Sequence, residues 1–363
     1  MESIKINAGG FLKGEAKIPS SKSIGHRALI CASLSEGISR ITNVDLSRDI
    51  FATCEVLRNL GVQISIDDNE ITVKGSGKIV YSGEELFCDE SGSTLRFLIP
   101  LALLQGNEVA FNGRGKLVER PLTPYYDIFT DKGIKFRNNM SQLPLALEGR
   151  LIPGNYRIPG GVSSQFISGL LFALPLLEGN SLLEIEGVLE SKPYIDLTLD
   201  TLKAFGININ NNNYRTFEIS GNQKYRARNY SVEGDYSQAA FFIAAGVMNG
   251  FIRCSNLNPV SLQGDKAVIE IVKAMGGDID ILGDKLIVKK SNLKAVNIDA
   301  SQIPDLVPIL TVLAAVSQGE TLIYNASRLR IKECDRLKAI AAELNKIGAH
   351  IIEETDSLRI EGV

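Results

Sequence analysis

The most regular feature of the chain is a repeated change from helical to strand periodicity. At five places an amphipathic helix pattern ends at a glycine, and a short aliphatic strand pattern follows. Glycine closes a helix readily because it adopts the left-handed backbone conformation without a steric penalty. Successive glycines are 72, 73, 70 and 72 residues apart; they are Gly61, Gly133, Gly206, Gly276 and Gly348. This spacing predicts a structural repeat of about 72 residues.

Each repeat contains a second predicted helix that begins in a loop of small and polar residues. In the first repeat, Ile24, Ala28, Leu29 and Ala32 lie on one face of a helix that follows residues 19–23. The other four starts are predicted at 90–94, 161–165, 234–237 and 303–305, where Pro304 suits a first helical turn. Strands are predicted around 71–73 and 286–288, and residues 210–213 are interpreted as a hairpin tip.

Length and composition narrow the class of protein. The 363 residues are 44% hydrophobic and 22% charged, which is typical of a globular chain of about two domains. A net charge of -3 gives no electrostatic reason to bind nucleic acid or an anionic membrane. The apolar runs are far shorter than the roughly 20 residues of a membrane span. Five scattered cysteines without a CxxC pair, and only two histidines, indicate neither disulfides nor a metal site. We therefore expect a cytoplasmic protein.

The small-residue helix starts are candidate anion sites, because their unpaired N–H groups lie at the positive end of the helix dipole. One such start alone is more often only an N-cap. Here basic residues accompany several of them: Lys22, Arg27, Arg96, Arg120, Lys332 and Arg336. We place Lys332 and Arg336 on one helical face with Glu333 beside them, although that cluster fits an exposed ion-pair ladder equally well. Together these features predict a cleft for a compact, multiply anionic ligand.

An ordered series of motifs resembles the enolpyruvyl transferases, and among them the enolpyruvylshikimate-phosphate synthase branch. The similarity runs from Lys5 to the last residue. Its motifs are 19–23 with Arg27, 91–96, 119–122, 163–166, 191–196, 232–235, 303–305 and 332–336. Glu90 stands where many members carry asparagine. No single motif is decisive, but their order along the chain is.

This resemblance implies an α/β fold with two domains, each holding three copies of a βαβαββ unit. Residues 19–232 would form the first domain, on the shikimate 3-phosphate side. Residues 1–18 and 233–363 would form the second. Five repeats are visible, and a sixth glycine marker would fall near position 420 by the same period. We therefore expect a shortened chain with an incomplete second domain and a weakened phosphoenolpyruvate site, and a monomer when the sixth unit is present.

The resemblance also implies the reaction and its residues. The enolpyruvyl group of phosphoenolpyruvate would pass to shikimate 3-phosphate with release of phosphate, in aromatic amino acid (chorismate) biosynthesis and without a cofactor. Lys22, Asp305 and Glu333 would serve in proton transfer, with Asp305 accepting the hydroxyl proton. Shikimate 3-phosphate would contact Lys22, Ser23, Arg27, Ser163, Ser164, Gln165, Ser191, Tyr194, Asp305 and Lys332. Phosphoenolpyruvate would contact Lys22, Gly92, Arg120, Gln165 and Arg336.

Three alternatives remain open from the sequence. The sister enzyme acting on UDP-N-acetylglucosamine shares the fold, but its members open with Lys-Asn rather than Lys22-Ser23, and many carry a reactive cysteine where 113–121 has none. An RNA-end-processing relative would need a nucleotide-attaching histidine late in the chain and a basic surface. The third is an inactive, shortened form that only binds shikimate 3-phosphate. Structurally, Asp305 also fits a dipole-complementing first-turn carboxylate, Tyr194 a packing aromatic and Gln165 a surface residue.

Overall fold

The computed structural model describes residues 9–363 and divides them into two compact units. The 20–233 unit also includes Ile331–Cys334, and the 234–363 unit comprises residues 9–19, Gly234–Arg330 and Asp335–Val363. Each unit has its own hydrophobic core. One core draws its buried residues from Ile24 to Val232, and the other from Ile18 and from Tyr236 to Ile360. Residues 1–8 of the predicted second domain lie outside the described part of the chain.

Five sheets share one strand order, which explains the repeat seen in the sequence. In one of them β5 (Leu86–Phe87) runs parallel to β6 (Glu108–Asn112), and β8 (Gln142–Glu148) pairs antiparallel with both β6 and β7 (Lys135–Asn139). Helices α3 (Gly92–Ala102) and α4 (Thr123–Lys132) connect these strands, giving a βαβαββ unit. The next unit runs through β9 (Gly154–Pro159), α5 (Ser164–Ala173), β10 (Ser181–Glu186), α6 (Lys192–Ala204), β11 (Ile209–Asn212) and β12 (Thr216–Ile219). The last runs through β18 (Ile298–Asp299), α9 (Val307–Ala315), β19 (Glu320–Tyr324), α10 (Arg336–Lys346), β20 (His350–Glu353) and β21 (Leu358–Glu361).

The two remaining sheets take their first strand from a distant part of the chain. One contains β2 (Ser35–Thr42), β3 (Gln63–Asp67) and β4 (Glu70–Ser76), with α1 (Lys22–Leu34) and α2 (Arg48–Asn59); its parallel partners are β13 (Tyr225–Arg226) and β14 (Tyr230–Ser231). The other contains β15 (Gly250–Ser255), β16 (Asp278–Leu282) and β17 (Lys285–Lys289), with α7 (Tyr236–Asn249) and α8 (Val268–Ala274). Its first strand is β1 (Leu12–Lys17), which pairs parallel with β15. Strand β1 directly precedes α1 in the sequence, but it belongs to the 234–363 unit, whereas α1 belongs to the 20–233 unit.

Hydrogen bonds fix the points at which the chain passes from one unit to the other. Within the 20–233 unit, the Ser21 amide donates to the Glu233 carbonyl at 2.8 Å. Within the 234–363 unit, the Asp235 amide donates to the Pro19 carbonyl at 2.9 Å. The 20–233 segment therefore begins and ends at neighbouring positions, and it is inserted into the sequence of the other unit.

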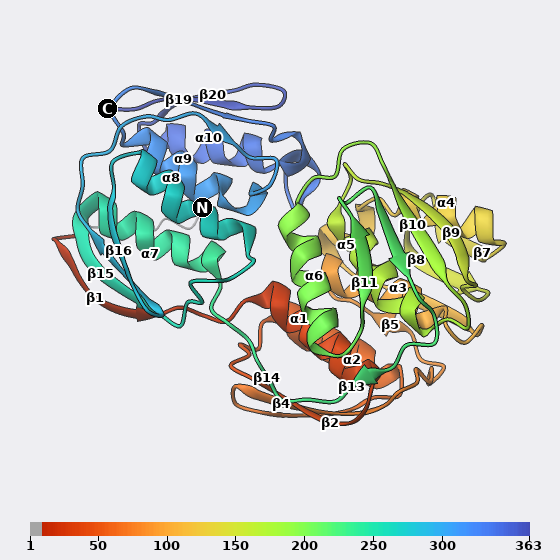
Figure 1. Cartoon of the computed structure of the whole chain (residues 1–363). Coiled ribbons are helices and arrows are strands. Elements are labelled where there is room, and N and C mark those ends of the chain that lie inside the picture. The colour runs from red at the N-terminus through yellow and green to blue at the C-terminus, as the bar shows by residue number, and fades with distance from the viewer. Residues whose placement is uncertain (1–8) are drawn as a thin grey trace. The chain divides into compact units, whose positions relative to one another are not determined.

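In the 20–233 unit, α1, α3 and α5 are almost entirely buried and the sheets lie outside them (Figure 1). In the 20–233 unit α3 packs on α5, and α1 packs on both α2 and α6. Buried and exposed residues alternate along strands such as β8, so one face of each sheet covers the helices and the other meets solvent. Aromatic pairs fill the helical interior, with ring centroids 5.5 Å apart for Phe97 and Phe172 and 4.9 Å apart for Tyr125 and Phe166.

The helix-closing role of the five repeat glycines is confirmed, since all have a positive φ between 68° and 99°. The second helices are also confirmed, and Pro304 lies in a 3-10 turn, Pro304–Leu306, just before α9. The hairpin tip at 210–213 is wrong in detail, because three of these residues form β11. Asn210 and Asn212 each donate to Glu218 on β12 at 2.9 Å, which extends the pairing and moves the turn to Asn213 and Tyr214.

Two further findings concern membranes and metals. Across residues 9–363, no helix is both long and apolar enough to cross a membrane. Over the same residues, no three His, Cys, Asp or Glu side chains are grouped as metal ligands.

Candidate active site

Four helix starts in the 20–233 unit present their N-terminal ends without a carboxylate. Helices α1, α3, α5 and α6 carry no acidic residue in the first turn, and small or basic residues precede or open each of them. Ser91 caps α3 by accepting from the Thr94 amide, and Ser163 caps α5 by accepting from the Gln165 amide. The positive ends of these helix dipoles are therefore not neutralised by their own first turns, which suits anionic ligands.

Lys22 and Ser23 open α1. The Lys22 ammonium pairs with the Asp49 carboxylate of α2 at 2.6 Å, and half of the Lys22 side chain is exposed (50%). An ion pair this open is weak because water screens it, so an incoming anion can compete for the ammonium. Asp49 was not foreseen from the sequence, although an acidic residue in the first turn of a predicted helix is a recognisable counter-charge for a nearby lysine.

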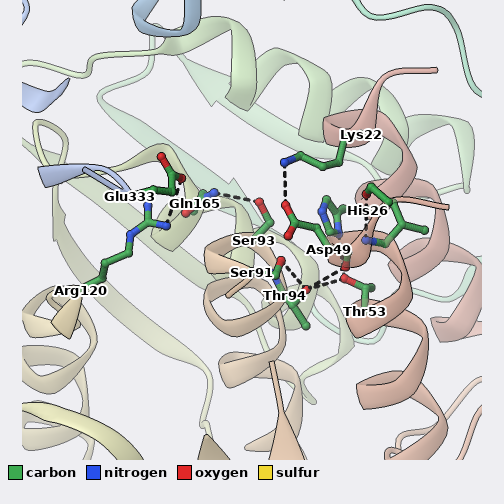
Figure 2. A network of polar contacts seen from close by, with 12 residues as sticks. Lys22, His26, Asp49, Thr53, Ser91, Ser93, Thr94, Arg120, Gln165 and Glu333 are labelled. Carbon is green, nitrogen blue, oxygen red and sulfur yellow. Dashed lines mark hydrogen bonds and ion pairs between the residues drawn. The ribbon is translucent and has the colours of Figure 1, made fainter. Parts of the chain in front are cut away.

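Arg120 and Gln165 lie near Ser93 at the starts of α3 and α5 (Figure 2), and Gly92 lies beside Arg120. Gln165 donates from Nε2 to Ser93 Oγ at 2.9 Å, and its Oε1 accepts from Arg96 Nη1 at 2.7 Å. Gly92 makes room for Arg120, because a Cβ at that position would lie 2.7 Å from Arg120 Nη1. Three of the predicted phosphoenolpyruvate contacts therefore lie close together at the start of α3.

Two cations, Arg96 and Arg120, lie at this helix start. Burial, together with the neighbouring charge of Arg120, lowers the pKa of Arg96 to about 9. Arg96 also stacks over the Phe166 ring, 4.8 Å from its centroid. Arg120 Nη1 lies 3.5 Å from Glu333 Oε1, and the Glu333 side chain is 57% exposed while that of Arg120 is 11% exposed. We expect the two adjacent guanidiniums to attract an anion. The Glu333 carboxylate lies beside one of them.

Arg27 is buried and connects α1 to α6. Its Nε donates to Thr198 Oγ1 at 2.8 Å, and its two terminal nitrogens donate to the carbonyls of Ser23 and Tyr194 at 2.7 and 2.9 Å. The guanidinium also lies over the Phe97 ring at 5.1 Å. Burial lowers the pKa of Arg27 to about 10, which leaves it charged at neutral pH. These contacts give Arg27 a positioning role for the start of α6.

The remaining predicted contacts of the 20–233 unit lie at helix starts. Ser164 is buried in the first turn of α5, whereas Ser163 and Gln165 are partly exposed. Ser191 precedes α6 in the left-handed conformation, with φ 55°, and is buried. Tyr194, in the first turn of α6, is partly exposed beneath Arg27.

The 234–363 unit holds the other predicted residues, Asp305 and Arg336. Arg336 Nη1 donates to Asp305 Oδ1 at 2.7 Å, and about a quarter of each side chain is exposed. Burial raises the pKa of Asp235, the N-cap of α7, and the negative charge of Asp305 adds to the increase. Carboxylates therefore lie at the helix starts around Asp235 and Asp305, in contrast to the starts of α1, α3, α5 and α6.

The placement of Lys332 and Arg336 on one helical face is wrong. Helix α10 begins only at Arg336, and residues 332–334 form a bend before it. Asp335 is the N-cap and accepts from the Lys338 amide at 3.1 Å, so the helix does not extend back to Lys332. Lys332 and Glu333 belong to the 20–233 unit, whereas Arg336 belongs to the other.

A buried hydroxyl network lies behind these helix starts and was missed from the sequence. It joins His26 of α1, Thr53 of α2 and Thr94 of α3 to the cap Ser91 (Figure 2). Its members are spread over three helices, so the helical periodicity of any one of them gives no signal.

The fold is that of enolpyruvyl transferases: an EPSP synthase from Acinetobacter baumannii superposes with a TM-score of 0.80 at 25% identity, covering 98% of this chain and 83% of that one. An enolpyruvyl transferase from Streptomyces tendae shares the fold with a TM-score of 0.77 at 20% identity, covering 98% of this chain and 84% of that one.

The sequence profile of EPSP synthase (3-phosphoshikimate 1-carboxyvinyltransferase) matches residues 6–363. A 3-phosphoshikimate 1-carboxyvinyltransferase from Clostridium novyi is 53% identical, covering 100% of this chain and 85% of the relative. One from Clostridium kluyveri is also 53% identical, covering 97% and 82%. The chain belongs to the EPSP synthase family, the branch that the motif series indicated.

Proposed function

We propose that this chain transfers the carboxyvinyl group of phosphoenolpyruvate to a hydroxyl of shikimate 3-phosphate, with release of phosphate, as a step of aromatic amino acid biosynthesis in the cytoplasm. Family membership at 53% identity is the observation that carries the proposal. The chemistry of the residues supports it, because the substrates are small and bear several negative charges, and the helix starts with their cations suit such ligands.

The reaction needs proton transfers and charge stabilisation but no covalent nucleophile. The acceptor oxygen bonds to C2 of phosphoenolpyruvate while the methylene C3 gains a proton, giving a tetrahedral intermediate. A proton then leaves the new methyl group as the C2–O bond to phosphate breaks, which restores the double bond. A base is needed for the hydroxyl proton and an acid for C3, and preorganised cations stabilise the charge that moves to phosphate.

We assign these tasks to the residues that the motif series indicated. Asp305 takes the hydroxyl proton, and Lys22 and Glu333 serve the proton transfers at carbon. Gly92, Arg120, Gln165 and Arg336 hold phosphoenolpyruvate, together with Lys22. Shikimate 3-phosphate is held by Lys22 and Gln165 together with Ser23, Arg27, Ser163, Ser164, Ser191, Tyr194, Asp305 and Lys332. The 20–233 unit would then supply most contacts to shikimate 3-phosphate. The ion pairs of Lys22 with Asp49 and of Asp305 with Arg336 are partly exposed, so substrate can exchange with either partner.

Phosphate release tests the proposal directly. The purified chain is incubated with phosphoenolpyruvate and either shikimate 3-phosphate or UDP-N-acetylglucosamine, and inorganic phosphate is measured together with the enolpyruvyl product by mass spectrometry. We expect phosphate and product only with shikimate 3-phosphate. Turnover with the UDP-sugar, or binding of shikimate 3-phosphate without turnover, would contradict the proposal.

A further inference from the structure

His26 is a buried polar residue to which the proposed chemistry gives no task. It lies on α1, one helical turn after Lys22, and its side chain is fully buried. Its Nδ1 is 2.8 Å from Thr53 Oγ1, whereas its Nε2 has no hydrogen-bond partner and the ring meets Phe97 edge-on. Burial lowers the pKa of His26 well below its usual range, and the charges of Lys22 and Arg27 contribute to the decrease.

The hydrogen bond of His26 begins a chain of hydroxyls that ends at a predicted substrate contact. Thr53 Oγ1 lies 2.7 Å from Thr94 Oγ1, and Thr94 Oγ1 lies 2.7 Å from Ser91 Oγ. Thr94 also approaches the carbonyl of Asp49, at 3.4 Å. The chain therefore joins α1, the first turn of α2 and the N-cap of α3, all inside one compact unit (Figure 2).

The last member of the chain is next to Gly92. Ser91 is the N-cap of α3, and Gly92 and Ser93 follow it at the start of the helix, against Arg120 and Gln165. We propose that His26 is a positioning residue: through Thr53 and Thr94 it fixes Ser91 and so holds the α3 start in the geometry that receives phosphoenolpyruvate. This inference rests on the proposed function for the identity of the ligand.

The direction of donation along these hydrogen bonds follows from where the protons can lie. If Nδ1 accepted from Thr53, the ring proton would sit on Nε2, as a buried donor without an acceptor, which proteins strongly avoid. With the proton on Nδ1, His26 donates to Thr53, Thr53 to Thr94 and Thr94 to Ser91. Ser91 Oγ then accepts from both the amide and the hydroxyl of Thr94, and its own proton is left to point toward a ligand at the helix start.

Four variants and one control separate this role from general packing. His26→Leu and Thr53→Val each remove one link while keeping the core apolar, and the double variant removes both. His26→Asn restores an N–H donor near the place of Nδ1. Thr311→Val is the matched control, since Thr311 is an equally buried threonine whose hydroxyl donates to a carbonyl within α9, away from the network.

Steady-state kinetics provide the first readout. We expect His26→Leu and Thr53→Val each to raise the KM for phosphoenolpyruvate roughly tenfold, the cost of leaving a buried partner unpaired. The KM for shikimate 3-phosphate should stay within about twofold. The double variant should be no worse than either single one, because both break the same chain. His26→Asn should recover most of the loss, and Thr311→Val should match the wild type. Equal changes in both KM values, or additive single effects, would overturn the proposal.

Two further readouts do not depend on turnover. Hydrogen exchange at the Thr94 amide should accelerate in His26→Leu and in Thr53→Val but not in Thr311→Val. Nitrogen-15 NMR of the two histidines of the chain should show the Nδ1-protonated form for His26. If the wild type released no phosphate, the proposed function would be wrong. Hydrogen exchange and NMR would still test whether His26 positions Ser91 through the hydroxyl network. Unchanged exchange at Thr94 would refute the positioning role even in an active enzyme.

Discussion

At the scale of single residues, Lys22 is held by a weak and exchangeable ion pair. Lys22 and Asp49 are both partly exposed, and an exposed ion pair contributes only about 0–1 kcal/mol to the free energy of unfolding. The ammonium therefore contributes little to stability, which leaves its charge for ligands.

Lys22→Met should consequently separate activity from stability. We expect turnover to fall by about 10²-fold or more, because one preorganised charge is lost where both substrates are proposed to bind. The melting temperature should change little. Phosphate release and a thermal melt measure the two effects, with Lys135→Met, an exposed lysine paired with Glu148 on the outer sheet, as the control. Near-normal turnover would remove Lys22 from the site.

His26 should make the stability of the protein depend on pH. Its pKa is lowered in the folded state, so between that pKa and the value of about 6.5 for an unfolded histidine only the unfolded chain binds the proton. Stability is thus retained above pH 6.5 and is lost as pH falls below it, approaching about 1.4 kcal/mol per pH unit from this residue. Urea unfolding of the wild type and His26→Asn between pH 5 and 8 compares the slopes. Parallel profiles would show that His26 titrates alike in both states.

At the scale of elements, the start of α3 depends on the absence of a Cβ atom at Gly92. Added atoms at this position would meet the end of the Arg120 side chain, which is flexible, rather than backbone. The helix can therefore tolerate a larger residue, but the guanidinium cannot stay where it is.

Gly92→Ala should for this reason damage binding more than folding. We expect the KM for phosphoenolpyruvate to rise by about tenfold or more, since Arg120 must move by more than a few tenths of an ångström. The KM for shikimate 3-phosphate and the melting temperature should change little. Kinetics with each substrate varied in turn provide the measurement, and Gly10→Ala, which meets open space, is the control. An unchanged KM would mean that Arg120 does not contact this substrate.

Much of the element scale could be predicted from the sequence, because helix ends carry local signals. The repeat glycines and the starts of α1, α3, α5 and α7 follow from residues within a turn of the boundary. The error at Lys332 has the same origin: Asp335 is a strong cap, and giving it more weight than the spacing of two cations would have placed the start of α10 correctly. The hydroxyl network has no such local signal, because His26, Thr53 and Thr94 meet only after three helices have packed.

At the scale of the whole molecule, the two cores share no residues, and the 20–233 segment supplies the whole of one of them. Its ends are bonded to each other through Ser21 and Glu233. Such a segment meets the usual conditions for folding by itself.

Residues 20–233 expressed alone should therefore fold. We expect a cooperative urea transition and a near-ultraviolet circular dichroism signal from its packed tyrosines, because all of its sheets and its aromatic core are intact. A fragment of equal length spanning 50–263 serves as the control, since it lacks α1 and β2 and so cannot complete the first sheet. A gradual, non-cooperative transition of the 20–233 fragment would show that it needs residues of the other unit.

The pairing of β1 with the distant β15 also affects the order in which the sheets can form during synthesis on the ribosome. Glu15 of β1 and Arg253 of β15 pair across 238 residues of sequence, so β1 is made long before its partner exists. At about 5–20 residues per second, this delay lasts on the order of ten to fifty seconds, long enough for the inserted segment to fold first. During this delay β1 is a strand without its partner, and nascent chains on neighbouring ribosomes are close by. Its Lys13, Glu15 and Lys17 are the kind of charges that discourage edge-to-edge association, so the same short strand is suited both to waiting and to pairing.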